Sequence, residues 1–174
     1  MERISQQELA RLGELAVEAE LVKQGWLVGN FNASIRNAAM YDIFAVKGRH
    51  KATLRVKAFR LNEKLFGSVL YSTKKDGEIF LGLDERNKSD ISVLAGIKDG
   101  NPKFFYVVPT LLIDKQIKEH HSAWMATPRK DGSKHKDSTL RQIIFDDNKD
   151  GISRGYKVKW KSYKNNWELL KEIK

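Results

Sequence analysis

Four side chains in the first third of the chain have the types and spacing needed for chemistry on a charged substrate: Glu14, Asp42, Arg55 and Lys57. Glu14 falls in a stretch of helical periodicity, Asp42 opens a short apolar run, and Lys57 closes a second run. Carboxylates are the ligands that a hard cation such as Mg²⁺ prefers. A cation beside them can stabilise negative charge that grows on a phosphate. The set therefore indicates a candidate site for an anionic substrate.

The elements that position these residues follow from local patterns. Ser5-Gln-Gln-Glu8 matches a capping box, so a helix is expected to begin there and to end at Gly25, a natural residue after a helix end. Residues 41–46 form a nearly continuous apolar run, which is typical of a strand covered on both faces. The next strand is predicted over residues 52–58. Arg55 and Lys57 are two apart, so they should point to the same side of the sheet.

The remainder of the chain favours more strands and a second long helix. Strands are predicted over residues 68–72, 78–83, 91–97, 104–108 and 156–161, a helix over 111–124, a long loop over 125–139 and a short helix over 166–173. Together these elements predict an α/β fold in which helices flank a central mixed β-sheet. The length predicts a single domain over residues 1–174.

Composition restricts the partners and the compartment. The 174 residues carry a formal net charge of +10, which favours polyanionic partners, nucleic acid first and an anionic membrane second. A basic protein without such a partner is the alternative. Cysteine is absent, which excludes disulfides and thiolate metal sites. There is no signal peptide pattern and no run of about 20 apolar residues, so a cytoplasmic protein that does not span a membrane is expected.

A helix glutamate, an Asp at a strand start and a strand ending in X-Val-Lys together resemble the core of the PD-(D/E)XK nuclease superfamily, the fold of restriction endonucleases and archaeal Holliday-junction resolvases. The resemblance extends to Lys57, and residues 105–109 also look like a late core strand of bacterial members. It is carried by Gly13-Glu14 with Gly25-Trp26, by Tyr41-Asp42-Ile-Phe-Ala-Val46, and by Leu54-Arg-Val-Lys57. The resemblance implies a restriction-endonuclease-like αβββ core, Mg²⁺-dependent endonuclease activity on DNA, and a homodimer, since many relatives pair to cut both strands.

The resemblance also implies roles for the four residues. Glu14 and Asp42 would bind Mg²⁺, and Lys57 would steady or activate the attacking water. Arg55, however, stands where the family carries Glu, Asp or Gln. Two unit charges about 4 Å apart interact by about 4 kcal/mol at an effective dielectric of about 20, so a guanidinium there opposes metal binding by a comparable amount.

Three arrangements of Arg55 stay open from the sequence. In the first, which is the simplest, Arg55 pairs with Asp42 and Glu14, and the protein is a catalytically inactive nuclease fold that binds nucleic acid or a protein partner. In the second, Arg55 turns towards DNA phosphates while Glu14, Asp42 and Glu18 hold the metal. In the third, a carboxylate from elsewhere replaces the missing one. An unrelated α/β domain would instead place Asp42 and Lys57 far apart.

Two further groups of basic residues are candidates for phosphate contacts. They are Arg129, Lys130, Lys134, His135 and Lys136 in the predicted long loop, and Lys157, Lys159 and Lys161 on the predicted last strand. Trp124 or His135 could also stack on nucleic acid, although anchoring in the core is the favoured interpretation for Trp124. The strand lysines could equally be edge charges that discourage pairing between sheets.

Overall fold

A five-stranded mixed sheet forms the centre of the computed structural model, which describes residues 4–31, 41–61, 67–72, 74–75, 77–83, 89–145 and 160–173. Strands β3 and β7 run parallel and the other neighbours run antiparallel. In spatial order the strands are β1 (Leu27–Asn30), β2 (Ile43–Lys47), β3 (His50–Arg60), β7 (Ile91–Lys98) and β8 (Asn101–Pro109). The predicted α/β class with a mixed sheet flanked by helices is confirmed.

Helix α1 (Gln6–Lys23) begins and ends where its sequence indicates. The Ser5 hydroxyl accepts from the Glu8 backbone N–H at 3.2 Å, and the Glu8 carboxylate accepts from the Ser5 N–H at 2.6 Å. The chain leaves the helix at Gly25, which has a φ of +78°. Glycine adopts this left-handed conformation without the steric strain that a side chain would cause. Reciprocal capping at one end and glycine at the other therefore fix the length of the helix.

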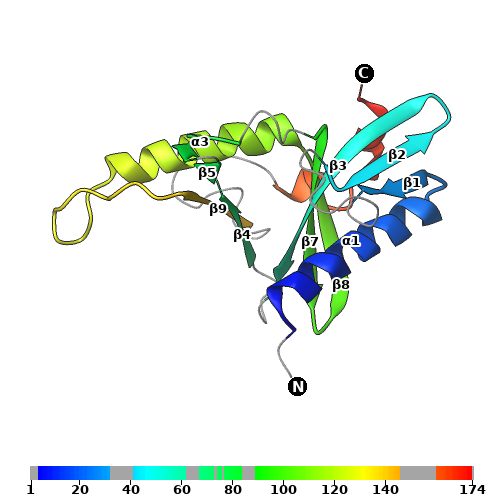
Figure 1. Ribbon diagram of the computed structural model, residues 1–174, viewed down its shortest axis with the longest axis horizontal. Helices are drawn as coiled ribbons and strands as arrows, with labels where there is room; N and C mark the ends of the chain where they lie inside the picture. Colours follow the sequence, from blue (N-terminus) through cyan, green and yellow to red (C-terminus); the bar gives the residue numbers. More distant parts are fainter. Residues whose placement is uncertain are drawn as a thin grey trace.

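Helices α1 and α3 (Thr110–Ala126) cover opposite faces of the central sheet (Figure 1). Leu54 and Val56 of β3 belong to the core beneath α1, together with Val17 and Leu21. Because side chains alternate along a strand, Arg55 and Lys57 must project towards the other face. That face carries the second core, to which α3 contributes Ile113 and Ile117, and the candidate cations therefore lie on the α3 side.

Close packing between α1 and β3 depends on Gly13. A Cβ atom on Gly13 would lie 2.7 Å from the Ala58 Cβ, which is closer than two carbons can pack. In Gly13→Ala, overpacking costs about 1–3 kcal/mol and better helix propensity returns roughly 1 kcal/mol, so the free energy of unfolding is expected to fall by up to about 2 kcal/mol. Urea unfolding would measure it, with Gly13→Ala/Ala58→Gly as the compensated control. A more stable Gly13→Ala variant would contradict this packing.

A two-stranded sheet lies against α3 beside the central sheet. It pairs β4 (Gly67–Ser72) with β9 (Leu140–Phe145) in antiparallel register. Strand β9 is not predicted by the sequence pattern, and its buried face is formed by Arg141 and Ile143. Helix α3 extends away from the central sheet, and the loop of residues 127–139 lies at its far end before the chain returns as β9 (Figure 1). We call residues 127–139 the basic loop.

Two other expectations need correction. The strand predicted over 78–83 is only β6 (Glu78–Ile79), paired with β5 (Lys74–Lys75). The carbonyls of Phe80 and Leu81 accept from the Arg141 guanidinium at 3.1 and 3.2 Å instead of continuing a ladder. In this way a buried arginine satisfies the backbone groups that a strand would have paired.

The strand predicted over 156–161 is wrong at its end, and residues 156–159 lie outside the described residues. Trp160–Tyr163 is a 3-10 helix (η2) because Trp160 is buried in the second core, and the predicted terminal helix is a 3-10 helix over Trp167–Lys171 (η3). Asn165 shields the edge of β8, donating its N–H to the Phe105 carbonyl at 2.7 Å. No helix among the described residues is long and apolar enough to cross a membrane.

Candidate functional site

Asp42 is held rigidly at the start of β2. Its carbonyl accepts from the Phe31 N–H at 3.0 Å, and its own N–H donates to the Leu54 carbonyl at 2.9 Å. The side chain is buried, at 6% exposure, and its Oδ2 accepts from the Val56 N–H at 2.7 Å. A buried carboxylate with a backbone donor is oriented before any ligand arrives.

Arg55 forms an ion pair with this carboxylate. Ile43 pairs with Leu54 across β2 and β3, so Asp42 and Arg55 face each other at the next step of the ladder. The Arg55 Nε lies 3.7 Å from the Asp42 Oδ2, and the arginine side chain stays 33% exposed. The sequence left three arrangements open for Arg55. In the first of them Arg55 pairs with Asp42 and Glu14, and the structure contains the contact with Asp42.

Lys57 completes a compact cluster with Asp42 and Arg55. Burial lowers the pKa of the Lys57 ammonium, the nearby Arg55 guanidinium lowers it further, and the Asp42 carboxylate acts in the opposite direction. The Lys57 Nζ also lies 5.0 Å from the centre of the Tyr71 ring, within the range of a cation–π contact. The structure thus brings Asp42, Arg55 and Lys57 close together.

The lowered pKa of Lys57 predicts a pH-dependent difference in stability. Below that pKa the folded state carries the full cost of a buried ammonium, and this cost disappears as pH rises to the ordinary value of 10.5. Lys57→Met removes the charge but keeps much of the volume, so at pH 7 it should unfold at the same or a higher urea concentration. The wild type should regain stability relative to Lys57→Met between the lowered pKa and pH 10.5. A difference that is constant over this range would contradict burial of the charge.

Glu14 has a different environment from the other three residues. It lies on α1, the helix that packs on the face of the sheet opposite to Lys57, and its carboxylate lies 3.0 Å from the Arg11 guanidinium. Arg11 also lies 3.7 Å from Glu18. Sequence reasoning missed Arg11, although its three-residue spacing from Glu14 on a helix is a usable signal. The helix carboxylates are therefore partly neutralised by a cation of their own helix.

The described residues do not fit a Mg²⁺ ion. No group of three or more His, Cys, Asp or Glu side chains lies together within them. At the candidate site Asp42 is accompanied by two cations, and its Oδ2 is already engaged by the Val56 N–H and by Arg55. Mg²⁺ requires oxygen ligands in near-octahedral geometry and is repelled by neighbouring cations. In this position the Arg55 guanidinium opposes the binding of a divalent cation beside Asp42.

The basic loop is an ordered turn that displays its cations. The Gly132 N–H donates to the Arg129 carbonyl and the Arg129 N–H donates to the Ser133 carbonyl, both at 2.9 Å. Hydrogen bonds from Ser133 lower the pKa of Asp131, which keeps this turn carboxylate ionised. Four of the predicted basic residues of the loop are exposed: Arg129, Lys130, Lys134 and Lys136. The ring of the fifth, His135, is half-buried. The loop therefore presents four exposed cations within eight residues.

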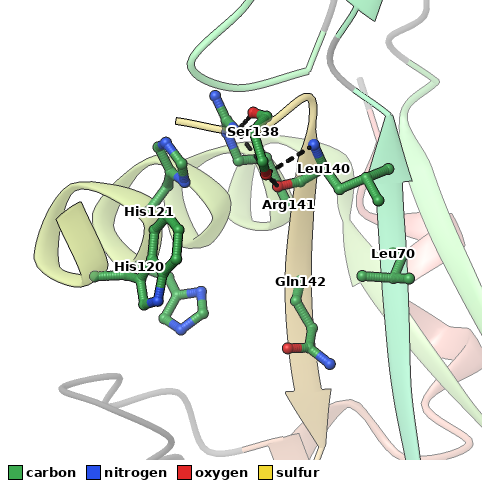
Figure 2. Close-up of a pocket in the computed structure, with 8 residues that line it drawn as sticks. Leu70, His120, His121, Ser138, Leu140, Arg141 and Gln142 are labelled. Atoms are coloured by element: carbon green, nitrogen blue, oxygen red, sulfur yellow. Dashed lines mark hydrogen bonds between the residues drawn. The ribbon is translucent and has the colours of Figure 1, made fainter. Parts of the chain in front are cut away.

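The base of the basic loop is anchored by Asp137 and Arg141. Burial raises the pKa of Asp137, but the Ser138 N–H together with Arg141 and His121 lowers it more, and the His121 Nε2 lies 2.8 Å from the carboxylate. The Arg141 guanidinium is buried, and Figure 2 shows it between α3 and β9 beside Ser138 and Leu140. Its contacts with backbone carbonyls make Arg141 a structural residue rather than a phosphate ligand.

Trp124 is half-buried and packs into neither core as far as the described residues form them, so its favoured interpretation as a core anchor is not supported there. Its ring stacks on His135 with centroids 4.1 Å apart and lies 5.6 Å from the His121 ring. A hollow of about 510 Å³ is lined by Trp124, His135 and the cations Arg129 and Lys130. A second hollow, of about 320 Å³, lies between α3 and β9 (Figure 2). Trp124 thus fixes the shape of the basic loop.

The predicted lysines of the last strand are only partly described. Lys157 and Lys159 lie outside the described residues, and Lys161 is exposed on the 3-10 helix η2.

Among the comparisons with known proteins, the comparison of structures gives a match. No protein-family model and no curated protein matches the sequence. Among solved structures, a bacterial homing endonuclease, I-Ssp6803I, superposes with a TM-score of 0.58 at 15% identity, covering 97% of this chain and 95% of its own. The chain has a nuclease-like fold. At this identity the likeness concerns the fold alone, and it extends over nearly the whole length of both chains.

Proposed function

We propose that the protein binds nucleic acid, most directly DNA, through a PD-(D/E)XK-type nuclease fold that does not cut. The ion pair between Asp42 and Arg55 carries this proposal, because it places a guanidinium beside the carboxylate that a nuclease uses for its metal. The net charge of +10 and the exposed cations of the basic loop supply the attraction to phosphates. The homing endonuclease acts as a precedent for the fold only.

A second candidate, a Mg²⁺-dependent DNA endonuclease, is favoured by Lys57. Its ammonium lies in the same cluster as Asp42, and its lowered pKa suits a residue that steadies or deprotonates water. In this alternative Glu14 and Asp42 bind Mg²⁺, and Arg55 contacts the phosphate once it leaves Asp42. This alternative requires Arg55 to move away from Asp42. It also requires one metal ion to contact both Asp42 and Glu14, which lies on the helix that packs on the opposite face of the sheet.

One experiment separates the two candidates. Supercoiled, linear and branched DNA are incubated with the protein and Mg²⁺ or Mn²⁺, and binding to the same substrates is measured in parallel. We expect binding without cleavage. Cleavage that disappears in Asp42→Asn would establish the endonuclease instead. Asn is preferred to Ala, because its amide oxygen can still accept from the Val56 N–H, which Ala would leave without an acceptor.

Pairing of two copies, which the family resemblance implies, stays a prediction that sedimentation analysis of the purified protein would check.

A further inference from the structure

The cluster that does not fit Mg²⁺ has the composition of an anion site. Arg55 and Lys57 contribute two positive charges, and Asp42 is the carboxylate that contacts Arg55, so within the part of the chain that the structure describes these three residues present two cations and one anion on the α3 face of the sheet. The Asp42 Oδ2 is directed to Arg55 and to a backbone donor. Two cations held close together and partly buried are costly, and an anion that enters would lower that cost.

Tyr71 adds an independent observation at the same place. Its hydroxyl is buried and forms no hydrogen bond of good geometry with the described residues, although the Ser92 hydroxyl lies close to it, and its ring lies under the Lys57 ammonium. Burial raises the pKa of the Tyr71 phenol, and the nearby Ser92 hydroxyl and the Arg55 guanidinium oppose this rise. Tyr71 is therefore a neutral donor close to Arg55. Few buried hydroxyls lack a partner, and each instance calls for an explanation.

Ser92, whose hydroxyl lies near Tyr71, is held in place by its neighbours. Ser92 of β7 pairs with Arg55 of β3 in the parallel ladder, and its hydroxyl lies 2.9 Å from the Thr110 hydroxyl at the start of α3. Thr110 in turn lies 3.1 Å from the Ser89 hydroxyl. This chain of buried hydroxyls holds Ser92 in place, so Arg55 and Tyr71 face a preorganised wall. The one-third exposure of Arg55 gives solvent access to the cluster.

We infer that Arg55, Lys57 and Tyr71 form a metal-independent binding site for a phosphate group of nucleic acid. The inference rests on the proposed function and specifies the ligand of the central cluster. The guanidinium plane matches the oxygens of a phosphate, the ammonium supplies a point charge, and the Tyr71 hydroxyl finds its acceptor. The phosphate can be a backbone phosphodiester or a terminal phosphomonoester, since both present the same oxygens.

The test measures fluorescence anisotropy of a labelled DNA duplex against salt, in EDTA and in Mg²⁺ at constant ionic strength. The wild type should bind as well in EDTA as in Mg²⁺. Arg55→Gln should weaken binding and reduce the slope of log affinity against log salt by about one, as expected for one lost phosphate contact. Lys103→Gln, which removes an exposed cation from β8, is the matched control and should bind like the wild type.

The Tyr71→Phe variant distinguishes a loss of phosphate binding from a loss of protein stability. It removes a hydroxyl without a well-formed hydrogen bond to the described residues, so its melting temperature should change little, yet its DNA affinity should drop several-fold with an unchanged salt slope. Duplexes with 5′-phosphate and with 5′-hydroxyl ends identify the source. A preference for the phosphate that Arg55→Gln abolishes assigns a terminal phosphate, and equal losses on both duplexes assign the backbone.

The possible failures are distinguishable. If the wild type does not bind DNA, the proposed function is wrong. If it binds, but folded Arg55→Gln and Tyr71→Phe bind equally well with the same salt slope, only the phosphate site is overturned. Binding that requires Mg²⁺ would also overturn it.

Discussion

Arg55→Glu is expected to convert the central cluster into a Mg²⁺ site, with affinity higher than the wild type by on the order of a thousandfold. The change removes a cation paired with Asp42 and places a second carboxylate opposite it. A unit charge about 4 Å from another contributes about 4 kcal/mol at an effective dielectric near 20, which corresponds to roughly three orders of magnitude in a binding constant. Calorimetric titration with Mg²⁺ at low salt would measure it.

Two controls make this result specific to the site. Lys51→Glu introduces the same charge reversal on β3 at an exposed position about 13 Å along the strand, given a rise of about 3.3 Å per residue. It should leave Mg²⁺ affinity unchanged. Asp42→Asn/Arg55→Glu should lose the gain, because a neutral amide replaces one of the two carboxylates. If Arg55→Glu binds Mg²⁺ no better than the wild type, Asp42 and residue 55 do not share a ligand position.

The parts of the fold that sequence predicted are those encoded by neighbouring residues. The capping box at Ser5 and the glycine at 25 determine α1 without help from the rest of the chain. The short turn between β2 and β3 forces Asp42 opposite Arg55, and the two-residue period of a strand places Lys57 beside Arg55. The cluster of Asp42, Arg55 and Lys57 was therefore accessible from the sequence.

The parts that sequence missed depend on contacts distant in the chain. Strand β9 forms because it can pair with β4, about 70 residues earlier. The role of Tyr71 appears only when β4 lies beside β3 and brings the ring under Lys57. The side of the sheet on which Glu14 lies was likewise unknowable, because a helix can pack on either face of a strand pair. Metal chemistry at Glu14 was inferred from resemblance, and the structure gives that carboxylate a guanidinium partner in Arg11.

The basic loop provides a separate source of affinity from the central cluster. Four of its cations are exposed and the turn that carries them is held by Asp131, Ser133 and Gly132. Each phosphate contact releases counterions and contributes about 0.9 to the salt slope. Since the loop lies at the far end of α3, its contribution should be independent of substitutions at Arg55 (Figure 1).

Neutralising the loop should therefore have a large effect on DNA binding. A variant with Gln at 129, 130, 134 and 136 is expected to lose between three and four units of salt slope and about a thousandfold in affinity near 0.15 M salt. Anisotropy titrations at several salt concentrations would measure both quantities. The matched control replaces four exposed cations of α1, the β2–β3 turn, β3 and β8: Lys23, Arg49, Lys51 and Lys103. Both variants lower the net charge by four. A loss that depends only on net charge would be equal in the two variants and would remove the basic loop from the interface, whereas a loss confined to the loop variant would show that phosphates bind there.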